Sequence, residues 1–131
     1  EGTSINLIFK NKSENYFRKI EKEVTLEELK KEDSVISMGG GAFLSSSIRK
    51  GAKKLSTTFW LDVPVDELIK RLKKSRQRPL LFKKNINETV KKIYFERKRI
   101  YNEADYRIKC HSLKSEEIAK KVLFLYEKSG N

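Results

Sequence analysis

The residues best suited to chemistry in this chain are its few arginines and one run of glycines. Basic residues number 30, and arginine is the minority among them, so arginine positions carry more information than the many lysines. Arginine presents a rigid fork of donors that can hold a carboxylate through two parallel hydrogen bonds, which lysine cannot reproduce. Gly39, Gly40 and Gly41 have no Cβ, so their backbone N–H groups can come close to a ligand.

The glycine run follows a short apolar stretch, Val35 to Met38. A stretch of that length, bounded by glycine, predicts a buried strand of a parallel sheet. Ligands of open α/β sheets bind beyond the carboxyl ends of strands, which favours a substrate-contacting turn. A tight strand-to-helix turn without a ligand is an equal alternative on the glycines alone, since the Gly-x-Gly-x-x-Gly pattern is not satisfied.

Arg18 and Glu21 are three residues apart in a predicted helix, so their side chains can meet on one face. Two interpretations are open. The pair is either a surface ion pair of little energetic value, or a carboxylate that holds an arginine in place for a ligand.

Composition indicates one globular domain over residues 1–131 with a strongly basic surface. The formal net charge of +12 favours anionic partners, among them nucleic acid, nucleotide phosphates and small carboxylates. Much of that charge is lysine, which we interpret as solvated surface. No apolar run reaches membrane-spanning length, and the start has no secretory signal pattern.

Two single residues narrow the chemistry further. Cys110 is the only cysteine and cannot form an internal disulfide, which favours a reducing cytoplasm, and we expect it in the core. His111 is the only histidine, so we expect neither a histidine-based metal site nor a catalytic triad.

Periodicity and capping residues predict alternating strands and helices, and therefore an α/β fold with a parallel sheet. An apolar patch at 3–10 could open a helix, Ser13 caps a helix over 14–31, and Asn87 and Ser115 cap two later helices. Residues 71–84 are rich in arginine, and Pro79 disfavours helix at Arg78, which indicates a mobile basic flap. The remaining elements are strands at 35–38, 57–63 and 106–110, and helices at 45–55, from Pro64 onward, at 88–103 and from 115 onward.

Taken in order, several motifs resemble the shikimate kinase family, small P-loop kinases that phosphorylate the 3-hydroxyl of shikimate with ATP. The resemblance runs from about Ser4 to the C-terminus, and it rests on the order and spacing of the motifs together. They are Ser4-Ile5 with Phe9, Phe17-Arg18 with Glu21, Val35 to Ala42, Trp60 to Pro64, Glu67-Leu68 with Arg71-Leu72, Arg78 to Leu81, Glu96-Arg97, and Tyr101 with Glu103 to Asp105.

The resemblance implies a role for each site residue. Arg18 and Arg97 would clamp the shikimate carboxylate, Glu21 would orient Arg18, and the backbone of Gly39, Gly40 and Gly41 would contact the ring hydroxyls. Arg78 would act on the transferring phosphate from a lid over about 71–84. Arg71, Ser112 and Lys114, with Arg78, would border the nucleotide.

The family fold implied is a three-layer P-loop kinase fold, and here its N-terminal βαβ part is missing. The family's Gly-x-x-x-x-Gly-Lys-Ser/Thr loop is absent from this sequence, as is the following Asp-x-Asp region. We therefore expect a fragment, lacking roughly 30 or more residues before Glu1, that is inactive alone. Mg²⁺ would be held in the missing part, with ATP as co-substrate, and no metal site is expected in this chain.

The resemblance also implies a cytoplasmic enzyme of chorismate biosynthesis, monomeric when complete, without nucleic-acid or membrane partners. Two other classes stay open. One is a related small-molecule kinase, such as a gluconate kinase, or a non-catalytic kinase-like protein. The other is a basic nucleic-acid-binding module. The aromatic residues argue against this class, because they form no stacking platform with interleaved arginines.

Overall fold

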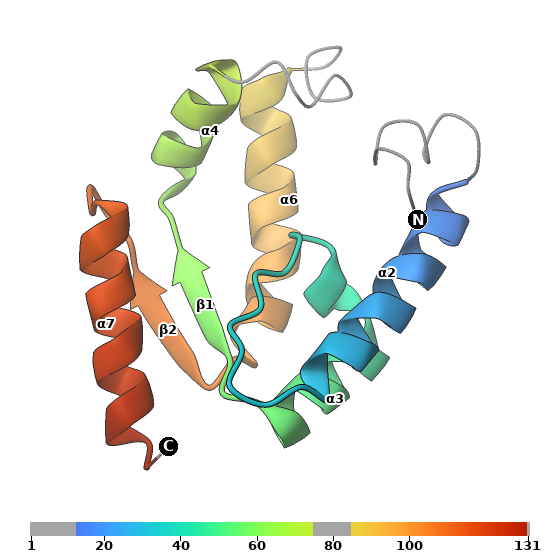
Figure 1. Ribbon diagram of the computed structural model, residues 1–131. Coiled ribbons are helices and arrows are strands. Elements are labelled where there is room, and N and C mark those ends of the chain that lie inside the picture. The colour runs from blue at the N-terminus through green and yellow to red at the C-terminus, as the bar shows by residue number, and fades with distance from the viewer. Residues whose placement is uncertain (1–12, 75–84, 131) are drawn as a thin grey trace. The chain divides into compact units, whose positions relative to one another are not determined.

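The computed structural model describes residues 13–74 and 85–130 (Figure 1). The chain divides into two compact units, one up to Ser56 and one from Thr57 onward. One domain over residues 1–131 stays a prediction. The apolar patch at 3–10 and residues 75–84 of the predicted lid, with Arg78, lie outside the described residues.

The first unit consists of α2 (Glu14–Leu29), the 3-10 turn η1 (Ala42–Leu44) and α3 (Ser46–Leu55). Ser13 caps α2 as predicted, since its Oγ accepts a hydrogen bond from the Tyr16 N–H at 3.1 Å. Ser45 caps α3 in the same way, accepting from the Ile48 N–H at 3.4 Å. The core of this unit is small and apolar: Leu29, Ala42, Phe43, Ile48 and Ala52.

The predicted strand at Val35 to Met38 is wrong. Residues 34–39 have no regular structure, and Val35 is 99% exposed. An apolar run forms a buried strand only where a neighbouring strand takes its backbone hydrogen bonds. Among residues 13–56 the structure assigns no strand, so this run has no strand partner among those residues.

The second unit is built on two parallel strands, β1 (Phe59–Asp62) and β2 (Tyr106–Lys109). They lie side by side in the register Phe59 to Tyr106 through Asp62 to Lys109 (Figure 1). Two reciprocal hydrogen bonds between Thr58 and Asp105, the residues just before β1 and β2, fix where the strands begin. The Asp105 carboxylate accepts from the Thr58 N–H at 2.8 Å, and the Thr58 hydroxyl accepts from the Asp105 N–H at 2.8 Å.

Helices α4 (Val65–Lys74), α6 (Ile86–Tyr101) and α7 (Ser115–Lys128) complete this unit. α4 packs on α6, and α7 packs on β2. The apolar core holds Trp60, Ile69, Val90, Ile108 and Cys110, so the core position expected for Cys110 is confirmed. Among the described helices, none is long and apolar enough to cross a membrane.

Two predicted caps are displaced by a residue or two. α6 is capped by Asn85, whose Oδ1 accepts from the N–H groups of Asn87 and Glu88 at 3.1 and 3.4 Å, and not by Asn87. α7 has Lys114 at its N-cap, and Ser115 is already helical. Asn85 and Asn87 are both suitable caps, and the helix extends to the earlier one.

Candidate functional site

The sequence-predicted arginine and glycine residues of the first unit come together at one place. Arg18 Nη1 donates to Glu21 Oε1 at 2.8 Å, and its Nε lies 3.8 Å from Glu14 Oε1. The Glu21 side chain is 15% exposed, whereas that of Arg18 is 38% exposed. A half-buried carboxylate therefore holds a partly open guanidinium, which is the geometry that the second interpretation of this pair requires.

The glycines lie against the same two side chains. A Cβ placed on Gly41 would lie 2.6 Å from Arg18 Cζ, which no real Cβ tolerates, and a Cβ on Gly39 would lie 3.4 Å from Glu21 Oε2. The φ angle of Gly41 is −90°, which any residue adopts. Glycine at this position leaves room for the Arg18 guanidinium, which lies directly on its backbone and which any Cβ would displace.

Arg97 belongs to the second unit and lies within α6, half-buried, about one turn before the helix ends at Tyr101. Arg18 and Arg97 are thus carried by different units. Their joint action on one carboxylate stays a prediction.

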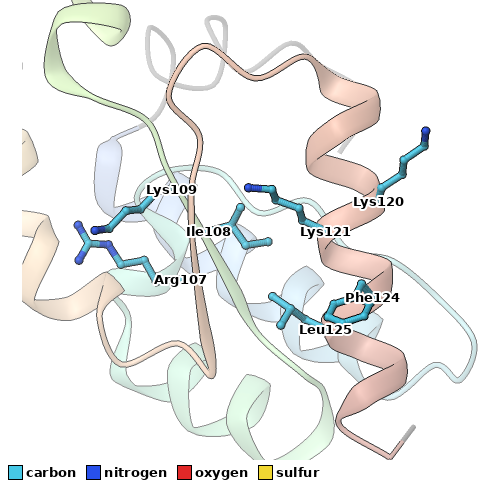
Figure 2. Close-up of a pocket in the computed structure, with 7 residues that line it drawn as sticks. All are labelled: Arg107, Ile108, Lys109, Lys120, Lys121, Phe124 and Leu125. Atoms are coloured by element: carbon cyan, nitrogen blue, oxygen red, sulfur yellow. The ribbon is translucent and has the colours of Figure 1, made fainter.

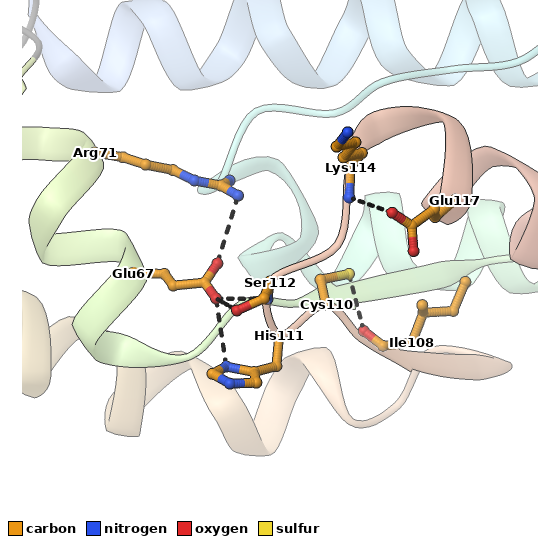
Figure 3. A network of polar contacts seen from close by, with 8 residues as sticks. All are labelled: Glu67, Arg71, Ile108, Cys110, His111, Ser112, Lys114 and Glu117. Carbon is orange, nitrogen blue, oxygen red and sulfur yellow. Dashed lines mark hydrogen bonds and ion pairs between the residues drawn. The ribbon is translucent and has the colours of Figure 1, made fainter.

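Two of the predicted nucleotide residues, Arg71 and Ser112, contact the carboxylate of Glu67 (Figure 3). Glu67 Oε1 accepts from the Ser112 N–H at 2.6 Å, and Glu67 Oε2 lies 3.7 Å from Arg71 Nη2. Lys114 is exposed, and within the described part of the chain no hydrogen bond joins it to Glu67. Its backbone N–H donates to Glu117 Oε1 at 3.4 Å. Sequence analysis placed Glu67 at the start of a helix and in a family motif with Arg71 but gave it no role. Its i,i+4 spacing from Arg71 was a signal for their contact.

Asp62 is the second carboxylate that sequence analysis left without a role. It is 7% exposed, accepts from the Tyr94 hydroxyl at 2.8 Å and from Arg107 Nε at 2.9 Å, and Arg107 stacks 4.7 Å from the centre of the Trp60 ring. Burial raises the pKa of Tyr94, and its hydrogen bond to Asp62 raises it further. Both carboxylate oxygens are occupied, so Asp62 connects β1, β2 and α6.

These residues do not fit a metal ion. Among the described residues, no three carboxylate, histidine or cysteine side chains come together as a metal site. Mg²⁺ prefers several oxygen ligands in octahedral geometry. The oxygens of Asp62 accept from a tyrosine and an arginine, and this carboxylate is not part of a cluster of such ligands among the described residues.

A separate hollow of about 430 Å³ lies between β2 and α7 (Figure 2). It has an apolar floor, Ile108, Phe124 and Leu125, and cationic side chains around it, including Lys120 and Lys121. Among the residues that the structure describes, no predicted site residue lines this hollow, so the predicted site residues described here lie outside it.

Two parallel strands with helices between them define an α/β protein. An arginine fixed by a carboxylate beside a glycine turn is an arrangement that can bind a small anionic molecule. The shikimate kinase family model matches residues 1–126 of this chain.

Known relatives agree with that match. The shikimate kinase of Aquifex aeolicus is 39% identical over 127 residues, covering 97% of this chain and 74% of the relative. That of Persephonella marina is 37% identical, covering 94% of this chain and 74% of the relative. Among solved structures, shikimate kinase from Acinetobacter baumannii in complex with shikimate has a TM-score of 0.90 at 27% identity. The match covers 98% of this chain and 72% of the Acinetobacter baumannii chain.

The chain belongs to the shikimate kinase family. The prediction of a P-loop kinase α/β fold is confirmed with it. The chain spans about three quarters of the length of these relatives.

Proposed function

We propose that this chain carries the shikimate-binding part of an enzyme that transfers the γ-phosphoryl group of ATP to the 3-hydroxyl of shikimate. The observation that carries this proposal is the Arg18 guanidinium, held at 2.8 Å by Glu21 and lying against Gly41, in a chain that belongs to the shikimate kinase family. A fixed, partly exposed guanidinium matches the carboxylate of shikimate through two hydrogen bonds.

Each remaining residue has one task in this proposal. Arg97 is the second ligand of the carboxylate, and the backbone of Gly39, Gly40 and Gly41 contacts the ring hydroxyls. Positive charge near the transferring phosphoryl group stabilises its transition state, and Arg78 supplies it.

Arg71, Ser112 and Lys114 border the nucleotide in this proposal. The contacts that support it are those of Glu67, which ties Arg71 to the loop containing Ser112. Because the described residues do not fit Mg²⁺, we assign no step of the reaction to a metal held by them.

Phosphoryl transfer depends on a P-loop, whose backbone and lysine cradle the phosphates. These 131 residues contain no Gly-x-x-x-x-Gly-Lys-Ser/Thr motif. We therefore propose that the chain transfers phosphate only together with a P-loop segment.

We also propose that the enzyme acts as a monomer in the cytoplasm and binds neither nucleic acid nor membrane. Support comes from its family. A steep, salt-dependent affinity for DNA or RNA would contradict this part of the proposal.

The test is an ADP-release assay with a P-loop segment from the Aquifex aeolicus relative joined in front of Glu1. We expect turnover with shikimate, none with gluconate, and none from the 131 residues alone. Turnover of gluconate in preference to shikimate would assign the chain to a related small-molecule kinase. Turnover by the 131 residues alone would show that the nucleotide site is misplaced.

A further inference from the structure

We propose that Glu67 is a positioning residue for the nucleotide, acting through the loop His111–Lys114 and through Arg71. This inference rests on the proposed function, because it takes that loop and Arg71 as the nucleotide border. Glu67 itself needs no contact with the nucleotide.

The contacts of Glu67 join two parts of the unit that are distant in sequence (Figure 3). Its Oε1 accepts from the Ser112 N–H at 2.6 Å, and lies 3.4 Å from Ser112 Oγ and 3.3 Å from His111 Nδ1. Its Oε2 lies 3.7 Å from Arg71 Nη2. One carboxylate on the first turn of α4 therefore holds the loop that leads from β2 to α7.

These contacts differ in strength, and exposure decides which one dominates. The side chain of Glu67 is 22% exposed, whereas those of Arg71 and His111 are 58% and 78% exposed. Solvent screens the ion pairs with exposed partners. The short hydrogen bond from the Ser112 backbone to an ionised carboxylate is the stronger contact.

The backbone of Ser112 explains why the loop needs this support. Its φ angle is 53°, in the left-handed region that L side chains rarely adopt. Such conformations persist only where the surroundings hold them, and they cluster at functional sites. Here the carboxylate of Glu67 binds the N–H of the strained residue itself, and so fixes the direction in which the loop presents Lys114 and the start of α7.

Arg71 depends on the same carboxylate at its other oxygen. Loss of Glu67 would therefore release the loop and the arginine together. The proposed shikimate residues of the first unit, Arg18 and Gly41, take no part in this network. We expect nucleotide binding, and not shikimate binding, to respond.

The first measurement is amide hydrogen exchange of the 131-residue chain by NMR. Glu67→Ala should accelerate exchange of the Ser112 amide at least about tenfold, since a hydrogen bond to a charged group is lost. Exchange at Ile108 reports global stability and serves as the internal reference. Asp66→Ala is the matched control, because it removes an exposed carboxylate from the same helical turn.

The second measurement is calorimetric titration with ATP and with shikimate, on the chain joined to a P-loop segment. Glu67→Ala should weaken ATP binding about tenfold and change shikimate binding less than twofold. Glu67→Gln keeps an oxygen that can accept from the Ser112 N–H but loses the charge. It should retain most of the Ser112 protection and fall between Ala and wild type in ATP affinity.

The two measurements separate the possible failures. Unchanged Ser112 exchange in Glu67→Ala overturns the positioning role whatever ATP binding does. Should the alanine variant not fold, a Glu67→Gln variant that binds ATP as tightly as wild type overturns it. Accelerated Ser112 exchange with unchanged ATP affinity overturns the placement of the nucleotide at this loop, and the inference with it. A loss of shikimate affinity equal to that of ATP would also overturn it.

Discussion

A methyl group added at Gly41 should displace Arg18 without unfolding the protein. The Cβ of Gly41→Ala would lie 2.6 Å from Arg18 Cζ, so one of the two must move. The guanidinium is the end of a flexible side chain that is 38% exposed, and it can move away. The backbone has no reason to change, because the φ of −90° suits alanine.

The expected loss of shikimate affinity in Gly41→Ala follows from the contacts that Arg18 loses. Displacement breaks its 2.8 Å hydrogen bond to Glu21 and takes the guanidinium away from the proposed carboxylate position. A hydrogen bond between charged groups contributes about 1.5–3 kcal/mol, so shikimate should bind about 10- to 150-fold more weakly. The free energy of unfolding should change by less than about 1 kcal/mol, because the gain of about 0.4–1 kcal/mol from restricting the unfolded chain offsets the loss of the partly exposed Arg18–Glu21 pair, about 0.2–1 kcal/mol.

The assay is calorimetric titration with shikimate, in the chain joined to a P-loop segment, combined with thermal unfolding. Arg18→Ala completes a double-mutant cycle. If Gly41→Ala acts only by displacing Arg18, it should have almost no further effect in the Arg18→Ala background. A full additional loss of affinity in that background would refute the reasoning, as would unchanged binding in Gly41→Ala alone.

Three further outcomes are expected. Arg97→Ala should weaken shikimate binding by about 2–5 kcal/mol in calorimetry. Arg99→Ala, which removes an exposed arginine two residues along α6, should leave shikimate binding unchanged. Equal effects of the two substitutions would show that Arg97 does not bind the shikimate carboxylate. Burial raises the pKa values of Cys110 and Tyr94 above their ordinary 9.0 and 10.0, so folding favours the protonated forms. The free energy of unfolding should therefore fall as pH rises above about 9, less steeply in Tyr94→Phe, and a flat profile in denaturant titrations would contradict this. Cys110, with no exposed surface, should react with a thiol reagent only in denaturant, and rapid labelling of the folded chain would count against its burial.

Local signals predicted most of the elements. Ser13 before an amphipathic stretch marked the start of α2, and the β-branched and aromatic residues around Trp60 marked β1, because capping and strand preference depend on neighbouring residues only. The apolar run at Val35 was predicted as a strand and is exposed, because a strand also needs a neighbour that local sequence cannot supply.

The site was predicted unevenly for the same reason. The contact between Arg18 and Glu21 follows from helical spacing, and it is confirmed. The contact between Glu67 and Ser112 joins residues far apart in the chain, and no spacing rule reaches that far. The role of glycine at Gly41 was expected from ligand approach, whereas the structure shows that its missing Cβ leaves room for the side chain of Arg18.

The central claim is that Arg18 recognises the carboxylate of shikimate. The most direct measurement compares the binding of shikimate with that of its uncharged methyl ester, by calorimetry, in the chain joined to a P-loop segment. Wild type should prefer shikimate, and Arg18→Ala should lose about tenfold or more of that preference. Lys19→Ala, which removes the adjacent exposed cation, should keep it. Full retention of the preference in Arg18→Ala would contradict the claim.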